Sequence, residues 1–396
     1  MDPIANPFSP GAGMPPPELV GREALLESSR VTLERVRAGR GTKSLLMVGL
    51  RGVGKTVLLN RIRRQAVEAG LAVVELEAPE GRSLPAMLAP ELNRSLIALS
   101  RTEKARELAK RARRALAAFV PAMRLKYADV ELQLDLEPEP ELAGSGDFYS
   151  DLRGLLRSCG EAAKAADSVL AITIDELQYV ERDQMAVLIT ALHDAAQRRL
   201  PITLLGAGLP QLRGQMGKAK SYAERMFNFP EIGPLPPDAA RDALEIPIRA
   251  AGVEIENAAV ERIQGLTQGY PYFLQEWGAQ TWLAATGSRI TAGDVASASE
   301  AAIAALDQDF FGVRFDRCTP RERAYLRAMA ELGPGPFRSG EIAEAFGRST
   351  QSLGPLRSSL IQKGMIYSPA HGDTAFTVPL FDGYLKRVMP VFEREG

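Results

Sequence analysis

Cysteine and histidine are scarce in this chain of 396 residues, which has two of each. Cys159 and Cys318 lie far apart, with no second thiol near either, so neither a disulfide framework nor a cysteine-based zinc site is expected. Two histidines are too few for histidine-based metal chemistry. These absences favour a reducing compartment and a chemistry that depends on other side chains.

The chain also lacks long apolar runs, and its basic and acidic residues nearly balance. No stretch approaches the roughly 20 apolar residues of a membrane span. Residues 1–18 are rich in proline and glycine but lack the basic start and apolar centre of a signal peptide. We therefore expect a cytoplasmic protein that does not engage a membrane. With 48 basic and 49 acidic residues the net charge is −1, so any nucleic-acid surface has to be local.

What the sequence does contain is the motif GLRGVGKT at residues 49–56. It fits the pattern of a glycine, four free positions and then Gly-Lys-Thr. The apolar run 45–48 before it is typical of a buried strand, and residues 57–62 after it have helical spacing. This order predicts a phosphate-binding loop in which backbone N–H groups turn inward, Lys55 reaches the β- and γ-phosphates, and Thr56 ligates Mg²⁺. The expected nucleotide contacts are Gly49, Gly52, Val53, Gly54, Lys55, Thr56 and Val57.

A second chemical element closes the apolar run SVLAITIDE at residues 168–176. A strand that ends in two acids is often only the start of a helix cap. Because Asp175 and Glu176 follow a phosphate loop by about 120 residues, they are its expected partners. Asp175 would bind the nucleotide's Mg²⁺, and Glu176 would orient and deprotonate the attacking water. The predicted cofactors are ATP and Mg²⁺, and the predicted activity is ATP hydrolysis, with Glu176 and Lys55 as catalytic residues.

Alternating strands and helices predict an α/β fold with a parallel sheet of the P-loop NTPase type, which binds nucleotide at the strands' carboxyl ends. The chain is too long for one core, so we expect several domains. Residues 1–18 are predicted to be an extended arm rather than packed structure. Residues 19–236 are predicted to form the ATPase core, 237–317 a helical lid and 318–396 a winged helix-turn-helix domain.

Residues 82–147 are predicted to be a charged insertion in the core. Ten bases and two acids occur between residues 94 and 126, whereas seven acids and no base occur between 129 and 147. Apolar spacing predicts an amphipathic helix in the basic part, and alternation predicts a half-exposed strand at 130–136. Two interpretations are open, a solvated insertion whose two parts attract each other and a nucleic-acid contact along the basic helix.

The C-terminal segment has helical patterns at 320–332, 340–346 and 352–363, followed by a hairpin of residues 365–367 and 374–378. Three helices and a hairpin predict a winged helix-turn-helix. The candidate contacts to double-stranded DNA are Ser349, Thr350, Gln351, Arg357 and Ser358 on the helices, with His371 and Thr374 on the wing. From Cys318 onward ten bases meet eight acids, a weak charge for DNA binding. A DNA-binding and a purely packing or regulatory domain both remain open.

With these motifs the sequence resembles the AAA+ ATPases from about residue 20 to residue 389. It resembles in particular the branch of archaeal and eukaryotic origin-recognition initiators and related prokaryotic ATPases with a C-terminal winged helix. The resemblance implies that Val20, Gly21 and Arg22 touch adenine. It also implies that Arg225 acts as an arginine finger on a neighbour's nucleotide, in a homo-oligomer that forms with ATP. A salt-bridged surface arginine is the alternative interpretation of Arg225.

Two departures from the family pattern bear on the function. The fourth strand ends in Gly-Ala-Gly at 206–208, where the family has a polar side chain, and the lid turn QGYP at 268–271 lacks the arginine that initiators present to the γ-phosphate. This turn, with Pro271, resembles the lid motif of STAND signalling ATPases, which often act as slow switches. The resemblance implies a slow, DNA-associated nucleotide switch. The alternatives are a STAND-like signalling or defence ATPase with a regulatory winged helix, and an ATPase that loads a partner protein through residues 82–147.

Overall fold

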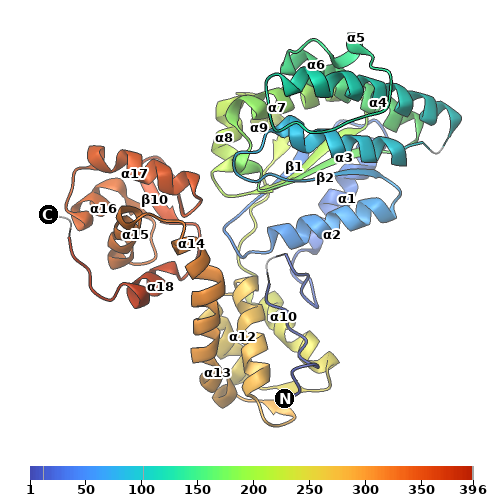
Figure 1. Cartoon of the computed structure of the whole chain (residues 1–396). Helices are drawn as coiled ribbons and strands as arrows, with labels where there is room; N and C mark the ends of the chain where they lie inside the picture. Colours follow the sequence, from blue (N-terminus) through green and yellow to red (C-terminus); the bar gives the residue numbers. More distant parts are fainter. Residues whose placement is uncertain (12, 101, 395–396) are drawn as a thin grey trace.

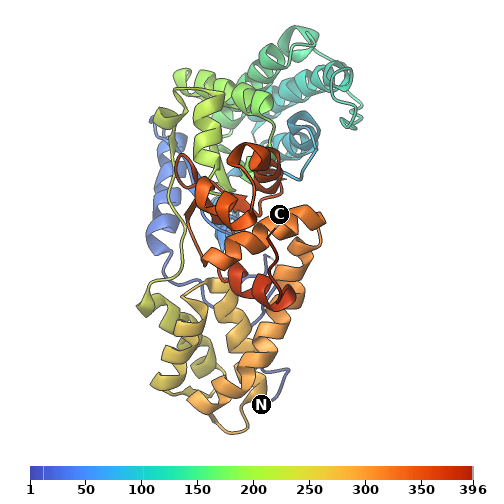
Figure 2. The same cartoon turned by 90° about the vertical axis from the view of Figure 1, so that its left-hand side faces the viewer.

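The computed structural model describes residues 1–11, 13–100 and 102–394. Figure 1 shows three lobes: a core that contains the sheet, a helical lid below it, and a small C-terminal domain to one side. Turned by 90°, Figure 2 shows the C-terminal domain lying across the junction of the other two lobes. None of the helices in the described residues combines the length and apolar composition that crossing a bilayer requires.

The core is built on five parallel strands in the order β2-β3-β4-β1-β5. The strands are β1 (Ser44–Val48), β2 (Ala72–Glu77), β3 (Leu170–Asp175), β4 (Ile202–Gly208) and β5 (Phe227–Asn228). Every residue of β3 and β4 is buried, as expected for strands that have helices on both faces. The predicted parallel α/β fold is confirmed.

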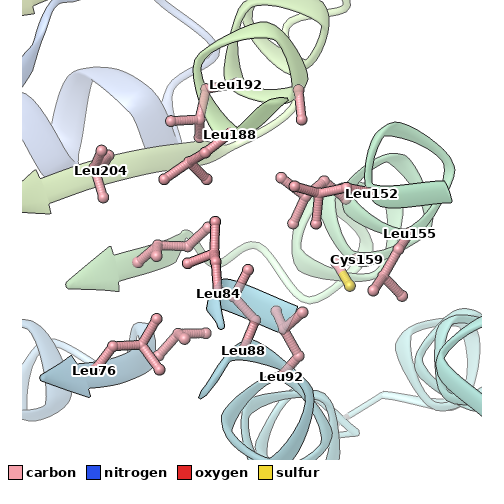
Figure 3. Close-up of a cluster of buried hydrophobic side chains, with 14 of the residues drawn as sticks. Leu76, Leu84, Leu88, Leu92, Leu152, Leu155, Cys159, Leu188, Leu192 and Leu204 are labelled. Atoms are coloured by element: carbon pink, nitrogen blue, oxygen red, sulfur yellow. The ribbon is translucent and has the colours of Figure 1, made fainter. Parts of the chain in front are cut away.

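Helices cover both faces of this sheet. One face packs against α1 (Glu23–Arg37) and α2 (Lys55–Glu68), and the other against α3 (Leu84–Ala98), α6 (Phe148–Ala165) and α7 (Arg182–Gln197). Figure 3 shows leucines from β2, β4, α3, α6 and α7 packed together, with the thiol of Cys159 among them. Burial raises the pKa of Cys159 to about 12, so this residue acts as a small apolar side chain.

The insertion at residues 82–147 is folded into the core. It consists of α3, α4 (Glu103–Arg124) and α5 (Pro140–Ala143), and the apolar face of α4 is buried. The predicted strand at 130–136 is wrong, because no neighbouring strand lies beside this segment. Two of its carbonyls accept hydrogen bonds from Arg124 instead: Nε donates to Val130 O at 3.1 Å and Nη2 to Leu132 O at 3.5 Å. Arg111 and Glu139 form an ion pair at 3.1 Å, which joins the basic part to the acidic part.

The N-terminal arm contains no helix or strand among its described residues, but the expectation that it stays unpacked is wrong. The arm lies along α12 (Pro271–Ala284) of the lid, and Phe8 is only 5% exposed. Gly278 makes this possible, because a Cβ at that position would lie 2.7 Å from the Phe8 ring. Asn6 Nδ2 also donates to Ala279 O at 3.2 Å. Proline prevents regular structure in the arm, yet the side chains of the arm still contact helix α12.

The lid contains α10 (Pro237–Ala250), α11 (Asn257–Thr267), α12 and α13 (Ala292–Ala305), with a short parallel pair of β6 (Glu254–Ile255) and β7 (Arg289–Ile290). Helix α13 continues as a π-helical segment, η2 (Leu306–Gly312), and then as α14 (Val313–Phe315). Figure 1 shows α14 where the lid meets the C-terminal domain.

The C-terminal domain has the order of helices and strands expected for a winged helix. Its helices are α15 (Pro320–Leu332), α16 (Ser339–Phe346), α17 (Thr350–Gln362) and α18 (Phe381–Val388). The expected hairpin, β9 (Ile366–Tyr367) with β10 (Asp373–Phe376), gains a third strand, β8 (Phe337–Arg338), to give an antiparallel sheet in the order β8-β10-β9.

The lid and the C-terminal domain share one hydrophobic core, which the sequence did not predict. The ring centroid of Tyr384 on α18 lies 5.3 Å from that of Phe311 and 5.7 Å from that of Phe315. Phe311 also contacts Phe381 at 5.8 Å. This continuous packing of aromatic rings holds the lid and the C-terminal domain together.

Within the C-terminal domain, the buried carboxylate of Glu322 ties α15 to α17. It accepts hydrogen bonds from Thr319 N at 2.7 Å, Ser359 Oγ at 2.7 Å and Lys363 Nζ at 2.6 Å. Burial alone would raise the pKa of this carboxyl group, but the hydrogen bonds outweigh burial and lower the pKa to about 2. Because the folded pKa lies below the usual value, the stabilisation is present above about pH 4.5 and is lost as the pH falls toward 2.

Glu322→Gln is therefore expected to reduce the free energy of unfolding by about 2 kcal/mol at pH 7 and by much less near pH 2.5. Urea denaturation at both pH values measures the difference. Glu341→Gln is the control, because Glu341 caps the shorter helix α16 from an exposed position, and it should change stability by about 0.5 kcal/mol or less. Equal losses for Glu322→Gln at the two pH values would contradict this account.

Candidate functional site

The glycine-rich loop lies between the end of β1 and the start of α2. Gly52 and Gly54 have φ angles of 81° and 88°, a left-handed conformation that favours glycine. Lys55 is only 8% exposed, and its Nζ donates to Gly49 O at 3.0 Å and to Leu50 O at 2.8 Å. Burial lowers the pKa of Lys55 to about 8. The loop thus curls around a buried amine at the start of a helix, which is an arrangement suited to an anion.

Asp175 ends β3 and supplies a buried carboxylate beside the loop. It is 4% exposed, and its Oδ1 accepts a hydrogen bond from Glu176 N at 2.8 Å. Among the residues that the structure describes, no lysine, arginine or histidine forms an ion pair with it. Its negative charge interacts with the nearby cations Lys55 and Arg63. Mg²⁺ is commonly held by one carboxylate, a hydroxyl and substrate phosphates. Asp175 and Thr56 therefore fit the predicted Mg²⁺.

Glu176 follows in a left-handed backbone conformation, with φ of 50°, that is uncommon for residues other than glycine. Its carboxylate lies between two donors. Gln178 Nε2 donates to one oxygen, and Arg51 Nη1 lies 3.6 Å from the other. The predicted general base is thus held in a defined orientation at the carboxyl end of β3.

Gln178 is a residue of this candidate site that the sequence did not reveal. Its Oε1 accepts a hydrogen bond from Leu209 N at 3.0 Å, directly after β4, while its Nε2 binds Glu176. The glycine at 208 leaves room for this side chain, because a Cβ there would lie 2.7 Å from Gln178 Oε1. Gln178 therefore supplies the polar group that residues 206–208 lack. The available signal was a glutamine two residues after the Asp-Glu pair.

On the opposite side of the loop, residues 20–22 lie where the core meets the lid. Arg22 Nη2 donates to Gly233 O at 2.5 Å and approaches Val53 O at 3.5 Å, and burial lowers the pKa of Arg22. Gly21 packs close to Ala239 of α10, and Val20 packs against the lid core. The three residues predicted to touch adenine thus line the junction beside the phosphate loop.

The lid contacts the phosphate loop directly. Tyr272 N donates to Gly52 O at 3.2 Å, and Pro271 is the first residue of the same helix, α12. The ring of Phe310 also approaches the loop, since a Cβ at Gly52 would lie 3.3 Å from it. Tyr272 and Phe310 stack with their ring centroids 4.6 Å apart. The predicted Gly-x-Pro turn therefore places an aromatic pair against the loop.

The C-terminal domain reaches the same loop from another side, a contact that no sequence pattern indicated. Arg51 N donates to Thr377 O at 3.1 Å. The Arg51 side chain donates to Tyr179 Oη at 2.8 Å, and a Cβ at Gly364 would lie 2.9 Å from Arg51 Nη2. The loop is thus contacted by core, lid and C-terminal domain together.

Arg225 lies outside this cluster. It is exposed on α9 (Ala223–Met226), just before the edge strand β5. It forms no ion pair with any residue that the structure describes, so the salt-bridged alternative gains no support.

The candidate DNA contacts are mostly exposed. Ser349 caps α17, and Thr350, Gln351, Ser358 and His371 lie at the surface. Arg357 differs from the expectation. Its Nε donates to Thr374 Oγ1 at 2.8 Å, and its Nη2 donates to Ser368 Oγ at 3.0 Å and to Asp373 O at 2.9 Å. Its guanidinium therefore binds the protein's own hairpin and is not directed toward a groove.

Comparison with known families gives two matches. Residues 18–205 match the family described as AAA ATPase domain. Residues 308–385 match a family described as a domain of unknown function (DUF8462). The first match includes the phosphate loop, Asp175, Glu176 and Gln178, whereas the second match covers α14 and most of the C-terminal domain. No curated protein matches the chain.

Several solved structures share the fold. The Walker-type ATPase PABY2304 of Pyrococcus abyssi aligns with a TM-score of 0.60 and 16% identity, over 93% of this chain and 96% of that one. The Orc1 protein of Aeropyrum pernix, solved in complex with DNA, gives 0.47 and 15% over 93% of each chain. Cdc6p from Pyrobaculum aerophilum gives 0.46 and 16% over 98% of each chain. The first similarity shows that the other protein shares this fold over nearly its whole length. The other two alignments are looser and decide nothing further.

Proposed function

We propose that the protein is a Mg-ATP-dependent AAA+ ATPase that acts as a nucleotide-driven switch. The observation that carries this proposal is the convergence of three parts of the chain on the phosphate loop. The lid contacts Gly52 through Tyr272 N, and the C-terminal domain contacts Arg51 through Thr377 O. A nucleotide bound in this loop would therefore lie close to the core, the lid and the C-terminal domain, the three parts whose relative positions a switch has to change.

The residues of the site account for the chemistry. The N–H groups of the loop and Lys55 bind the phosphates, while Thr56 and Asp175 hold Mg²⁺, which neutralises phosphate charge when bound. Glu176 accepts a proton from the attacking water as the new O–P bond forms and the bond to the bridging oxygen breaks. Gln178 holds the Glu176 carboxylate in position for this step. Since Arg51 also engages that carboxylate, we propose that turnover is slow.

For the C-terminal domain, a regulatory role is the first of two candidate roles that we propose. The domain docks on the phosphate loop through Thr377, and its Arg357 is engaged within the domain. DNA association is the second candidate. An open groove at the start of α17 favours it, because this groove lies beside the exposed candidate contacts. The polar and charged residues that line it are Arg321, Glu344, Arg348, Ser349 and Ser352.

The experiment that tests the proposed function is ATP hydrolysis by the full chain, with and without double-stranded DNA, at low and moderate salt. We expect measurable Mg²⁺-dependent hydrolysis that DNA does not change, as a regulatory C-terminal domain requires. Stimulation by DNA that fades with salt would support the DNA-associated candidate instead. A full chain that neither binds nor hydrolyses ATP would refute both candidate functions.

We also propose that Arg225 acts on the nucleotide of a neighbouring copy. Its exposed position before the edge strand leaves it accessible to a second chain. Arg225→Ala is expected to lower kcat by about tenfold or more at protein concentrations where the chains associate, because a transition-state cation is lost. The ATPase rate of the wild type should then rise more steeply than linearly with protein concentration. Full activity of the variant would contradict this role.

A further inference from the structure

The N-terminal arm follows α12 of the lid over most of that helix. Trp282 Nε1, near the end of α12, donates to Asp2 O at 2.9 Å. Earlier in the helix, Gln275 Oε1 accepts a hydrogen bond from Ser9 N at 3.3 Å. The arm therefore runs antiparallel to α12, toward the end of the helix where Tyr272 contacts the phosphate loop. Figure 1 shows this segment in dark blue, rising beside the lid toward the junction with α2.

Phe8 is the apolar anchor of the arm. It is 5% exposed, and Gly278 on α12 provides the space for its ring, since a Cβ there would lie 2.7 Å from the ring. Glycine inside a helix is unfavourable relative to alanine, so the helix is less stable by itself at this position but offers a surface on which the ring can lie. Ile4 of the same arm is 94% exposed, so docking depends on Phe8 and not on apolar residues in general.

Beyond Ser9 the arm leaves the lid and reaches the core at the candidate nucleotide site. A Cβ at Gly13 would lie 3.6 Å from Cγ2 of Thr56, one of the two residues that fit Mg²⁺. Farther along the chain, Leu19 packs on the core cluster that contains Val53 of the phosphate loop. The arm is thus fixed on the lid at one end and on the core at the other, and it passes Thr56 in between.

The arm is also the part of these surroundings that can open at the least cost. The lid and the C-terminal domain share a large hydrophobic core, to which the arm contributes one buried ring, that of Phe8. Terminal segments with few buried contacts detach locally at a free energy well below that of global unfolding. The arm can therefore leave α12 while the lid and the core remain folded.

We propose that the N-terminal arm is a gate for nucleotide exchange: docked on α12, it closes the site beside Thr56, and it has to detach before Mg-nucleotide enters or leaves. This inference rests on the proposed function and adds a regulatory element to it. The docking contacts, at residues 2–9, precede the segment that matches the AAA ATPase domain. A gate slows entry and exit alike and leaves the affinity nearly unchanged, because it acts on the open fraction of the protein and not on the contacts of the nucleotide.

The test measures association and release of the fluorescent nucleotide mant-ADP, with Mg²⁺, by stopped flow on the full chain. Phe8→Ala is expected to raise both rate constants about tenfold or more and to change Kd less than about threefold, because loss of the buried ring favours the open state. Ile4→Ala is the matched control in the same arm and should change neither rate constant.

A second variant releases the arm from the side of the helix. The methyl group of Gly278→Ala would collide with the Phe8 ring, while alanine itself favours the helix. Gly278→Ala should therefore raise both rate constants as Phe8→Ala does, with the lid helix intact.

The outcomes separate this inference from the proposed function. If the wild type binds no mant-ADP, the proposed function fails. If it binds and Phe8→Ala, folded by circular dichroism, matches Ile4→Ala in both rate constants, the arm is not a gate while the proposed function stands. Faster release with unchanged association and a weaker affinity would also overturn the gate, because the arm would then act by supporting the binding site itself. If Phe8→Ala does not fold, Gly278→Ala decides by the same two rate constants.

Discussion

Glu176→Gln is expected to lower kcat for ATP hydrolysis about 100- to 1000-fold while changing ATP affinity less than about threefold. The amide has nearly the same shape as the carboxylate but cannot accept the proton of the attacking water. Affinity should survive because the loop and Lys55, which hold the phosphates, are unchanged in the variant. The left-handed backbone at Glu176 is independent of its side chain and should persist in the variant.

Single-turnover and steady-state hydrolysis, with calorimetric binding of ATP, measure the two effects separately. Glu181→Gln is the matched control, because Glu181 is an exposed carboxylate close in sequence that precedes α7. It should keep full activity. If the Glu176→Gln variant hydrolysed ATP at the wild-type rate, Glu176 would not be the general base, and the proposed mechanism would lack one.

Lys55→Ala is expected to weaken ATP binding about 100-fold or more, and to abolish hydrolysis with it. The ammonium is buried within the loop, where it donates to Gly49 O and Leu50 O. Its removal takes away the cation that binds the phosphates and leaves two inward-facing carbonyls that repel them. A buried, charge-assisted contact of this kind contributes about 3 kcal/mol or more, which corresponds to the stated loss of affinity.

Calorimetric titration with ATP and ADP checks this expectation, and thermal unfolding shows whether the variant is folded. Arg61→Ala on the same helix, α2, is the control: Arg61 is exposed and lies two turns further from the loop. Unchanged affinity in a folded Lys55→Ala variant would show that nucleotide, if it binds, binds elsewhere.

The sequence predicted those parts of the fold and site that depend on neighbours in the chain. The phosphate loop and the Asp-Glu pair each follow a buried strand, so their positions in a parallel sheet follow from local pattern alone. The parallel sheet was predicted for the same reason. The strand predicted at 130–136 failed because alternation describes one exposed and one buried side without requiring a partner strand. In this protein Arg124 of α4 takes the partner's place.

The remaining features depend on contacts between distant segments, which no local pattern encodes. Gln178 becomes informative only when β4 brings Leu209 beside it. The contact of Arg51 with Thr377 requires the C-terminal domain to fold back on the core. The packed N-terminal arm likewise depends on one glycine, Gly278, far along the chain.

The shared aromatic core of lid and C-terminal domain has a further consequence for how the molecule could move. A joint inside this core would have to separate rings such as Phe311 and Tyr384 and expose them to water. The easier pivot is the short connection between core and lid at residues 232–236, where Arg22 donates a hydrogen bond to Gly233 O. The lid and the C-terminal domain would then move together about this connection. A limited protease should accordingly cut this connection before it separates the two helical parts.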